Sequence, residues 1–137
     1  MGGSLYTPQG SYYHATKYAL EAWSDCLRLE MESFWLKIVI VKPGMIETEF
    51  DTLMVESLEK YSGDVPYGHM VAGYKKTLGQ GIKASPPRVI SDLIFKALET
   101  CRPKTRYVAG KFAKPMLFFY KWLGHRIYDW VAMRLAK

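Results

Sequence analysis

Hydrophobic positions recur with helical spacing near the start of the chain. From Ser11 to about Trp35, apolar residues such as Ala15, Ala19, Ala22, Cys26 and Leu29 return every three or four residues, which is typical of a helix with a broad apolar face. Ser11 is the candidate N-cap of this helix. The next run, "LKIVIV" at residues 36–41, is β-branched and is followed by Pro43-Gly44. Such a run is typical of a strand that is buried on both faces of a parallel sheet.

Weaker patterns follow this strand. Residues 47–61 favour a helix with Thr48 as a possible cap, residues 62–69 contain a turn, and residues 70–84 favour a second, weaker helix. A long segment of this kind in a compact domain typically covers a binding site or is mobile. Residues 51–84 are therefore the candidate substrate-binding segment. Three aromatic side chains are available to line it: Tyr61, Tyr67 and Tyr74.

A further helix and strand are predicted before a helical tail. The Ser-Pro-Pro sequence at residues 85–87 marks a helix start, and apolar residues define a buried face to about residue 100. "TRYVAG", residues 105–110, predicts a short strand that ends at a glycine. Residues 111–137 predict two short amphipathic helices with a break near Gly124.

The order of these elements predicts the fold class. A helix, a buried strand, an irregular segment, a helix and a strand fit an α/β fold with a parallel sheet. The length of 137 residues corresponds to one domain. Two strands do not make an independently stable parallel sheet, so we expect partners or a further segment to complete it.

Composition excludes several classes of protein. Hydrophobic residues make up 49% of the chain, which excludes a disordered protein. No apolar stretch reaches the roughly 20 residues needed to span a bilayer, and no secretory signal follows Met1, so a cytoplasmic location is expected. No metal is expected, because the histidines have no metal-site spacing: His14, His69 and His125.

Positive charge is concentrated at the end of the chain. Residues 1–101 hold 10 Lys or Arg against 12 Asp or Glu, whereas residues 102–137 hold 9 against 1, a net charge of +8. Two interpretations of this basic, aromatic tail stay open. It forms a membrane-surface helix, or it forms helices that pack over the substrate cleft. Nucleic-acid binding is not expected, because no reading motif is present.

A tyrosine and a lysine near the first helix start point to acid–base chemistry. In "GSYYHATKYALEAW", Tyr13 precedes Lys17 by four residues, so a helix presents both on one face. A free tyrosine has a pKa near ~10. A neighbouring ammonium and the positive end of the helix dipole lower the pKa of such a phenol. The phenol can then protonate a carbonyl oxygen as hydride reaches its carbon, or accept a proton in the reverse reaction.

The same spacing occurs at Tyr107 and Lys111, where it has no such meaning. That pair lies on a predicted strand that contains Gly110, so no helical face aligns the two side chains. The spacing alone is therefore weak, and the surrounding sequence must discriminate between the two pairs.

The sequence around Tyr13 resembles the second half of the short-chain dehydrogenase/reductases, a Rossmann-fold family of NAD(P)-dependent oxidoreductases. A loop with Pro8 precedes Tyr13-x-x-x-Lys17, and "LRLEM", a buried strand, Pro43-Gly44 and Thr48 follow in the family's order. The resemblance is close over residues 1–50 and looser over residues 85–110. It implies reversible hydride transfer between a nicotinamide cofactor, NAD or NADP, and a carbonyl/alcohol substrate.

The resemblance also implies roles for individual residues. Tyr13 would be the general acid/base, and Lys17 would lower its pKa and hold the nicotinamide ribose. Pro43 and Gly44 would form the turn that lines the nicotinamide, and Thr48 would hydrogen-bond the cofactor. The helix at residues 11–35 would be available to pack against a second copy in a homo-oligomer.

The family's glycine-rich dinucleotide loop has no counterpart in this sequence. The family's catalytic serine would fall one residue before Met1. We therefore expect residues 1–110 to be the C-terminal half of a Rossmann-like, doubly wound parallel sheet, truncated and inactive alone, with residues 111–137 as a helical extension. The alternative is a non-catalytic fragment that acts as an interaction or membrane-surface module.

Overall fold

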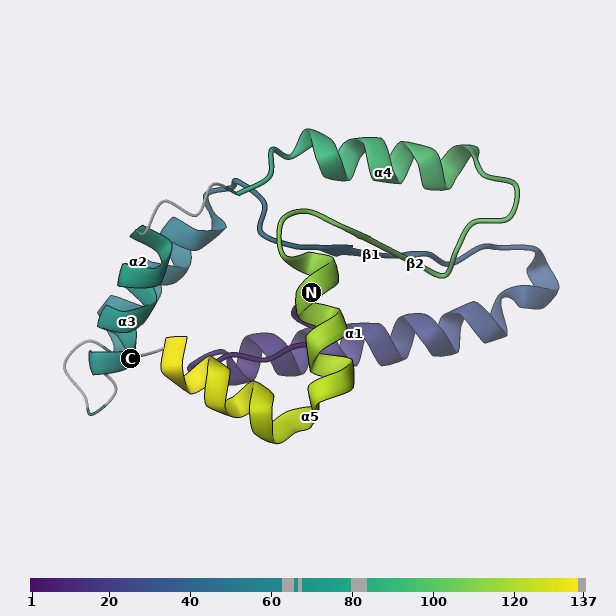
Figure 1. Cartoon of the computed structure of the whole chain (residues 1–137). Coiled ribbons are helices and arrows are strands. Elements are labelled where there is room, and N and C mark those ends of the chain that lie inside the picture. Colours follow the sequence, from purple (N-terminus) through teal and green to yellow (C-terminus); the bar gives the residue numbers. More distant parts are fainter. Residues whose placement is uncertain (63–65, 67, 80–83, 136–137) are drawn as a thin grey trace.

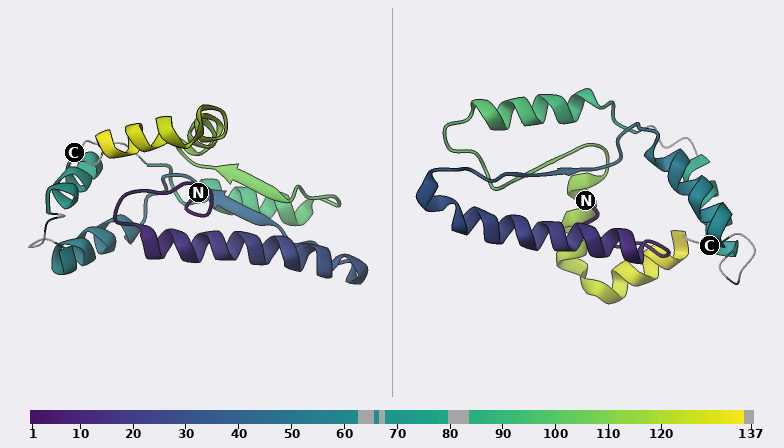
Figure 2. Two further views of the ribbon diagram at one scale, coloured as in Figure 1. Left: turned by 90° about the horizontal axis from the view of Figure 1, so that it is seen from below. Right: turned by 180° about the vertical axis from the view of Figure 1, so that it is seen from behind.

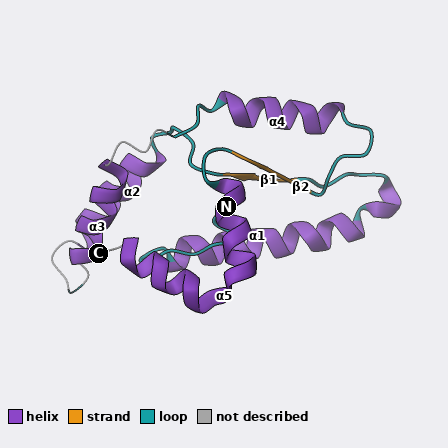
Figure 3. Cartoon of the chain, in the orientation of Figure 1, coloured by secondary structure: helices purple, strands orange, loops and turns teal. Residues whose placement is uncertain are grey.

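The computed structural model describes residues 1–62, 66, 68–79 and 84–135 (Figure 1). Helices predominate among them (Figure 3). In chain order the elements are α1 (Ser11–Glu30), the 3-10 helix η1 (Glu32–Phe34), β1 (Ile40–Pro43), α2 (Phe50–Ser62), α3 (Gly68–Gly79), α4 (Arg88–Glu99), β2 (Arg106–Ala109) and α5 (Ala113–Leu135).

The two strands of the described residues form a parallel pair. Ile40 lies opposite Arg106 and Pro43 lies opposite Ala109, and the chain passes through α2, α3 and α4 between the strands. Figures 1 and 2 show the strand pair lying between α4 and α1. The prediction of an α/β fold with a parallel sheet is confirmed. The wider, doubly wound sheet stays a prediction.

The boundaries of α1 differ from the predicted ones. The helix begins at Ser11 itself, its cap is Gly10 and no side chain makes a capping hydrogen bond, so the prediction of Ser11 as N-cap is wrong. The helix also ends at Glu30 and not near residue 35. A 3-10 turn follows it, and Trp35 then adopts a left-handed conformation with φ 61°, which ends helical geometry.

Strand β1 lies further along the chain than the predicted run at residues 36–41. Its pairing with β2 starts where the amide of Ile40 donates to the carbonyl of Thr105, at 2.9 Å. A strand exists only where a partner satisfies its backbone groups, and β2 lies beside residues 40–43 alone. The predicted burial on both faces is wrong, because Ile40 and Val41 are half-buried.

The later elements follow the predicted order. Helix α4 begins at Arg88, later than the Ser-Pro-Pro sequence, because Ser85 instead pairs with Ile46 in a parallel bridge. Two helices, α2 and α3, occupy most of residues 51–84, and an ion pair between Glu59 and Lys75 joins them. The predicted break in the tail is confirmed at Gly124, where φ is 70° and ψ is 174°.

The hydrophobic core of the described residues is small. Its buried apolar side chains come from the N-terminal segment, α3, β2 and the start of α5: Leu5, Val71, Tyr107 and Ala113. No helix in the described part of the chain combines the length and the apolar character that crossing a membrane requires.

A cluster of charged side chains connects α1 to both strands. The Lys42 ammonium on β1 lies 2.8 Å from a Glu21 carboxylate oxygen and donates to the Ser4 hydroxyl at 2.6 Å. Arg106 on β2 lies 3.2 Å from Glu21 and also pairs with Asp25. The hydrogen bond from Arg106 holds the pKa of Asp25 below its usual value. Lys42 is buried, so its ammonium needs this carboxylate partner.

The substitution Glu21→Ala is expected to destabilise the fold by about 2–3 kcal/mol, because it leaves the buried Lys42 without its carboxylate. The exposed pair Arg88–Asp92, with side chains 87% and 71% exposed, supplies the control. Asp92→Ala is expected to cost about 0.5 kcal/mol or less. Urea-induced unfolding measures both, and equal costs would contradict a stabilising role for Glu21.

Candidate active site

Tyr13 and Lys17 lie on consecutive turns at the start of α1. The Lys17 ammonium is 5.6 Å from the centroid of the Tyr13 ring. Tyr13 is 37% exposed, so solvent reaches part of its side chain, while the neighbouring Tyr12 is 90% exposed. The helix thus presents a phenol and an ammonium side by side on its surface.

The first residues of the chain lie between Tyr13 and the end of β1. A Cβ atom placed on Gly2 would be only 3.2 Å from the Tyr13 hydroxyl, so this backbone passes directly over the phenol. The Gly2 carbonyl accepts a hydrogen bond from His14 Nδ1 at 2.8 Å. The Met1 amine donates to the carbonyl of Pro43 at 2.9 Å. Residues 1–2 therefore connect the start of α1 to the carboxyl end of β1.

The loop from β1 to α2 also lies close to Tyr13. The ring of Phe50, the first residue of α2, is 5.5 Å from the Tyr13 ring between centroids. Thr48 precedes Phe50 by two residues and is exposed. The structure thus brings the end of β1, the loop that holds Thr48 and the Tyr13–Lys17 pair to one region.

Close backbone packing fixes the turn at Pro43-Gly44. The amide of Gly44 donates to the carbonyl of Ala109 at 2.7 Å. A Cβ atom on Gly44 would lie 2.5 Å from the carbonyl oxygen of Lys111 and 2.9 Å from the Cβ of Ala113, so only glycine fits there. Pro43 is exposed at this edge of the sheet.

Tyr107 and Lys111 do not form a comparable pair. Tyr107 is buried on β2, and its hydroxyl accepts a hydrogen bond from the Lys104 amide at 3.2 Å. The Lys111 ammonium lies instead over the ring of Phe112, 5.4 Å from its centroid.

The candidate substrate-binding segment, residues 51–84, is described only in part. Tyr61 lies on α2 and is exposed. Tyr67 and the side chain of Tyr74 lie outside the described residues. The role of this segment stays a prediction.

A cluster around Tyr6 attaches α5 to the segment that precedes Tyr13. The Tyr6 hydroxyl donates to an Asp129 carboxylate oxygen at 2.7 Å, and the Tyr128 hydroxyl donates to the Tyr6 carbonyl at 2.6 Å. The Tyr6 hydroxyl also lies 3.2 Å from His125 Nδ1, and the Tyr120 ring contacts Tyr6 edge-on. Sequence reasoning missed this cluster, because its two halves lie more than a hundred residues apart and no local pattern relates them.

Curated relatives align with most of the chain. Uncharacterized oxidoreductase YbbO of Escherichia coli strain K12 is 30% identical over 127 residues, 93% of this chain and 43% of that protein. Retinol dehydrogenase 16 of Homo sapiens is 33% identical over 143 residues, 93% of this chain and 45% of that protein. 17-beta-hydroxysteroid dehydrogenase type 6 of Mus musculus is 31% identical over 123 residues, 81% of this chain and 38% of that protein. No protein-family model matches.

These relatives are oxidoreductases by name, and their similarity extends well beyond the Tyr13–Lys17 motif. The chain belongs to the short-chain dehydrogenase/reductase family, as its sequence motifs predicted. It spans about half the length of the curated relatives it matches.

The hydrogen bond to Asp129 raises the pKa of Tyr6 to about 12. In the unfolded chain this phenol titrates near ~10. Its contribution to stability is therefore complete below pH ~10 and is lost as the pH rises towards about 12. Asp129→Asn is expected to move one tyrosine from about 12 towards ~10 in a tyrosinate absorbance titration. Asp92→Asn is the control, and an unchanged curve for Asp129→Asn would contradict the assigned bond.

Proposed function

We propose that this chain supplies the proton-transfer part of an NAD(P)-dependent oxidoreductase that interconverts a carbonyl and an alcohol. One observation supports this most directly. The Tyr13–Lys17 pair, the turn at Gly44 and the loop with Thr48 come from separate segments and lie beside one another. In open α/β sheets, ligands bind just beyond the carboxyl ends of the strands, which is where this group of residues lies.

Tyr13 is the proposed general acid/base. Its side chain is partly exposed, so a substrate oxygen can reach the hydroxyl, and the Lys17 ammonium lies 5.6 Å from the centroid of the ring. Reduction requires that Tyr13 donate its proton to the substrate oxygen, and oxidation requires that it accept one.

The residues at the end of β1 fit a nicotinamide cofactor, NAD or NADP. The cofactor would supply or accept the hydride. Gly44 is packed against backbone on one side and adds no side chain of its own, and Thr48 is exposed. Pro43, Gly44 and Thr48 would line the nicotinamide, and Lys17 would hold the adjoining ribose.

The proposed fold context is the C-terminal half of a Rossmann-like, doubly wound sheet over residues 1–110. The parallel pairing of β1 with β2 and the helices that accompany them support it. The 137 residues contain no glycine-rich dinucleotide loop. We therefore assign the pyrophosphate-binding loop to a segment outside them.

Helix α1 is the proposed surface for packing against a second copy of the chain. Three apolar residues on this helix are exposed and support that proposal: Leu20, Trp23 and Leu29.

The proposed substrate is a lipophilic alcohol or ketone. Relatives that cover most of this chain are named for retinol and a hydroxysteroid, both of which are lipophilic alcohols. A non-catalytic interaction module is the less favoured function. A purely structural tyrosine would be expected to be buried away from Lys17, whereas Tyr13 is partly exposed and lies beside it.

Tyr13→Phe is expected to lower turnover by about 100-fold or more, because the phenyl ring has no proton to transfer. Binding of NAD(P)H should be unchanged, which fluorescence titration measures. The assay uses the chain extended by the coding sequence upstream of Met1, with a panel of lipophilic aldehydes, ketones and alcohols. Tyr12→Phe, one residue away, is the control and should keep full turnover. Equal turnover in both variants would exclude Tyr13 as the proton donor.

Thr48→Ala in the same extended protein is expected to weaken NAD(P)H binding roughly fivefold, the worth of one hydrogen bond. Thr52→Ala is the matched control, since Thr52 is also exposed and lies one turn further along, within α2. Cofactor titration compares the two dissociation constants. A loss in the control as large as that in Thr48→Ala would contradict a direct contact between Thr48 and the cofactor.

A further inference from the structure

Helix α5 has an inner face that holds it to the rest of the chain. Ala113 is fully buried at its start. Further along, Tyr128 and Asp129 bond to Tyr6, and Tyr120 packs edge-on against the Tyr6 ring. These contacts fix which side of each helical segment is turned towards the protein.

Large apolar and aromatic side chains away from these contacts are exposed on both segments of α5. We name this set the outer face: Phe118, Phe119, Trp122, Leu123, Ile127, Trp130 and Val131. Beyond Gly124 its members at 127, 130 and 131 follow helical spacing, so they form one stripe. The rings contact one another, as Phe118 does Trp122 at 5.9 Å between centroids.

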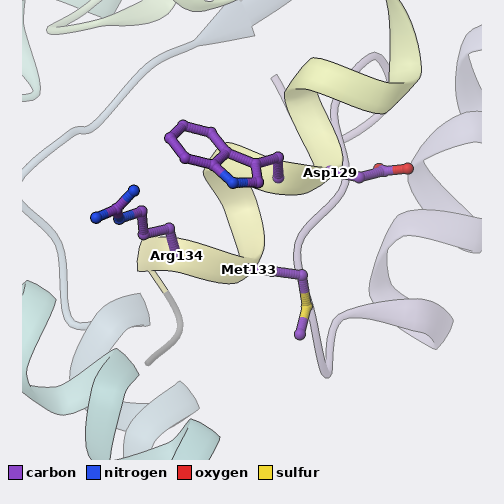
Figure 4. A pocket seen from close by; sticks show the side chains of 4 residues that line it. Asp129, Met133 and Arg134 are labelled. Carbon is purple, nitrogen blue, oxygen red and sulfur yellow. The ribbon is translucent and has the colours of Figure 1, made fainter.

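Cations surround the outer face. Exposed basic side chains occur along the whole helix: Lys114, Lys121, Arg126 and Arg134. The Arg134 guanidinium lies over the Trp130 ring, 5.0 Å from its centroid. The one acidic residue of the tail, Asp129, points the other way. A hollow at the end of α5 is lined by Asp129, Trp130, Met133 and Arg134. Figure 4 shows that Asp129 and Arg134 project from opposite sides of the helix.

We propose that the outer face of α5 binds the surface of an anionic lipid bilayer. A helix with aromatic and aliphatic residues on one side and Lys or Arg around them lies in the plane of the interface. Its apolar side chains enter the boundary between headgroups and acyl chains, and its cations attract anionic lipid. The proposal is independent of the proposed enzymatic function, because it involves neither Tyr13 nor Lys17.

Charge distinguishes a bilayer from a second copy of the chain as the occupant. Two tails brought face to face would place their cations together, with one acidic residue in each tail, held on its inner face by Tyr6. An anionic bilayer neutralises these charges and covers the aromatic residues at the same time. The observed combination of charge and exposed rings therefore favours lipid.

Co-sedimentation of the 137-residue chain with vesicles tests the proposal. Binding is expected to vesicles that contain phosphatidylserine, and much less to pure phosphatidylcholine. High salt should weaken the binding, because it screens the cations. Removing one cation, as in Arg126→Gln, should lower the partition coefficient roughly fivefold. A chain that stays in the supernatant at low salt, or that binds both vesicle types equally, overturns the proposal.

Two exposed tryptophans provide a matched pair of variants. Trp130 on the outer face and Trp23 on α1 are each 61% exposed. Trp130→Ser is expected to lower partitioning about tenfold, whereas Trp23→Ser should leave it unchanged. Equal losses, or a change of oligomeric state in Trp130→Ser without any vesicle binding, overturn the proposal in favour of a protein contact.

Tryptophan fluorescence tests the same face without depending on the stability of a polar variant. In Trp23→Phe/Trp35→Phe the remaining tryptophans are on α5, and in Trp122→Phe/Trp130→Phe they are on α1 and just after η1. Lipids brominated on their acyl chains should quench the first protein and not the second. Quenching of the second alone, or of neither, overturns the proposal.

Discussion

The charged cluster between α1 and the two strands is the interaction on which the arrangement of the site depends. Lys42 is buried in a strand, where it pairs with Glu21 and donates to the Ser4 hydroxyl. Glu21 also pairs with Arg106 on the other strand. Because a buried ammonium needs a carboxylate, α1 must present Glu21 at this place, which fixes the rotation of the helix and its position along the strands. Lys17 and Tyr13 precede Glu21 by four and eight residues, so the same constraint directs them towards the end of β1.

Polar contacts organise much of this structure because its apolar core is small. Four apolar side chains are buried among the described residues, while large ones on α1, α4 and α5 are exposed. Helices of this length gain most of their stability from packing one apolar face. Burying these exposed apolar faces would therefore add stability. The same helices also carry charged side chains, so any surface that covers one of these faces must accommodate those charges.

The elements themselves were predictable from sequence where local chemistry decides them. The break at Gly124, the strand that ends at Ala109 just before Gly110, and the α/β order follow from glycine and from hydrophobic spacing. The exact strand at 40–43 was not predictable from its apolar run, since a distant partner sets its limits. Nor was the Tyr6 cluster, because its bonds join the two ends of the chain. The site residues were identifiable by motif, but their surroundings were not.

Gly124, with its positive φ, separates the two halves of α5 and so determines where the tail can tolerate an inserted or deleted residue. One residue inserted within a regular helix turns everything beyond it by about 100° relative to what came before. An insertion in either half of α5 would therefore rotate its aromatic stripe out of phase. At Gly124 the helical backbone is already interrupted, and among the described residues a Cβ placed there would meet nothing within 4 Å beyond its chain neighbours and the nearby backbone of its own helix. Changes of length at this one position can alter the angle between the halves while each keeps its own phase.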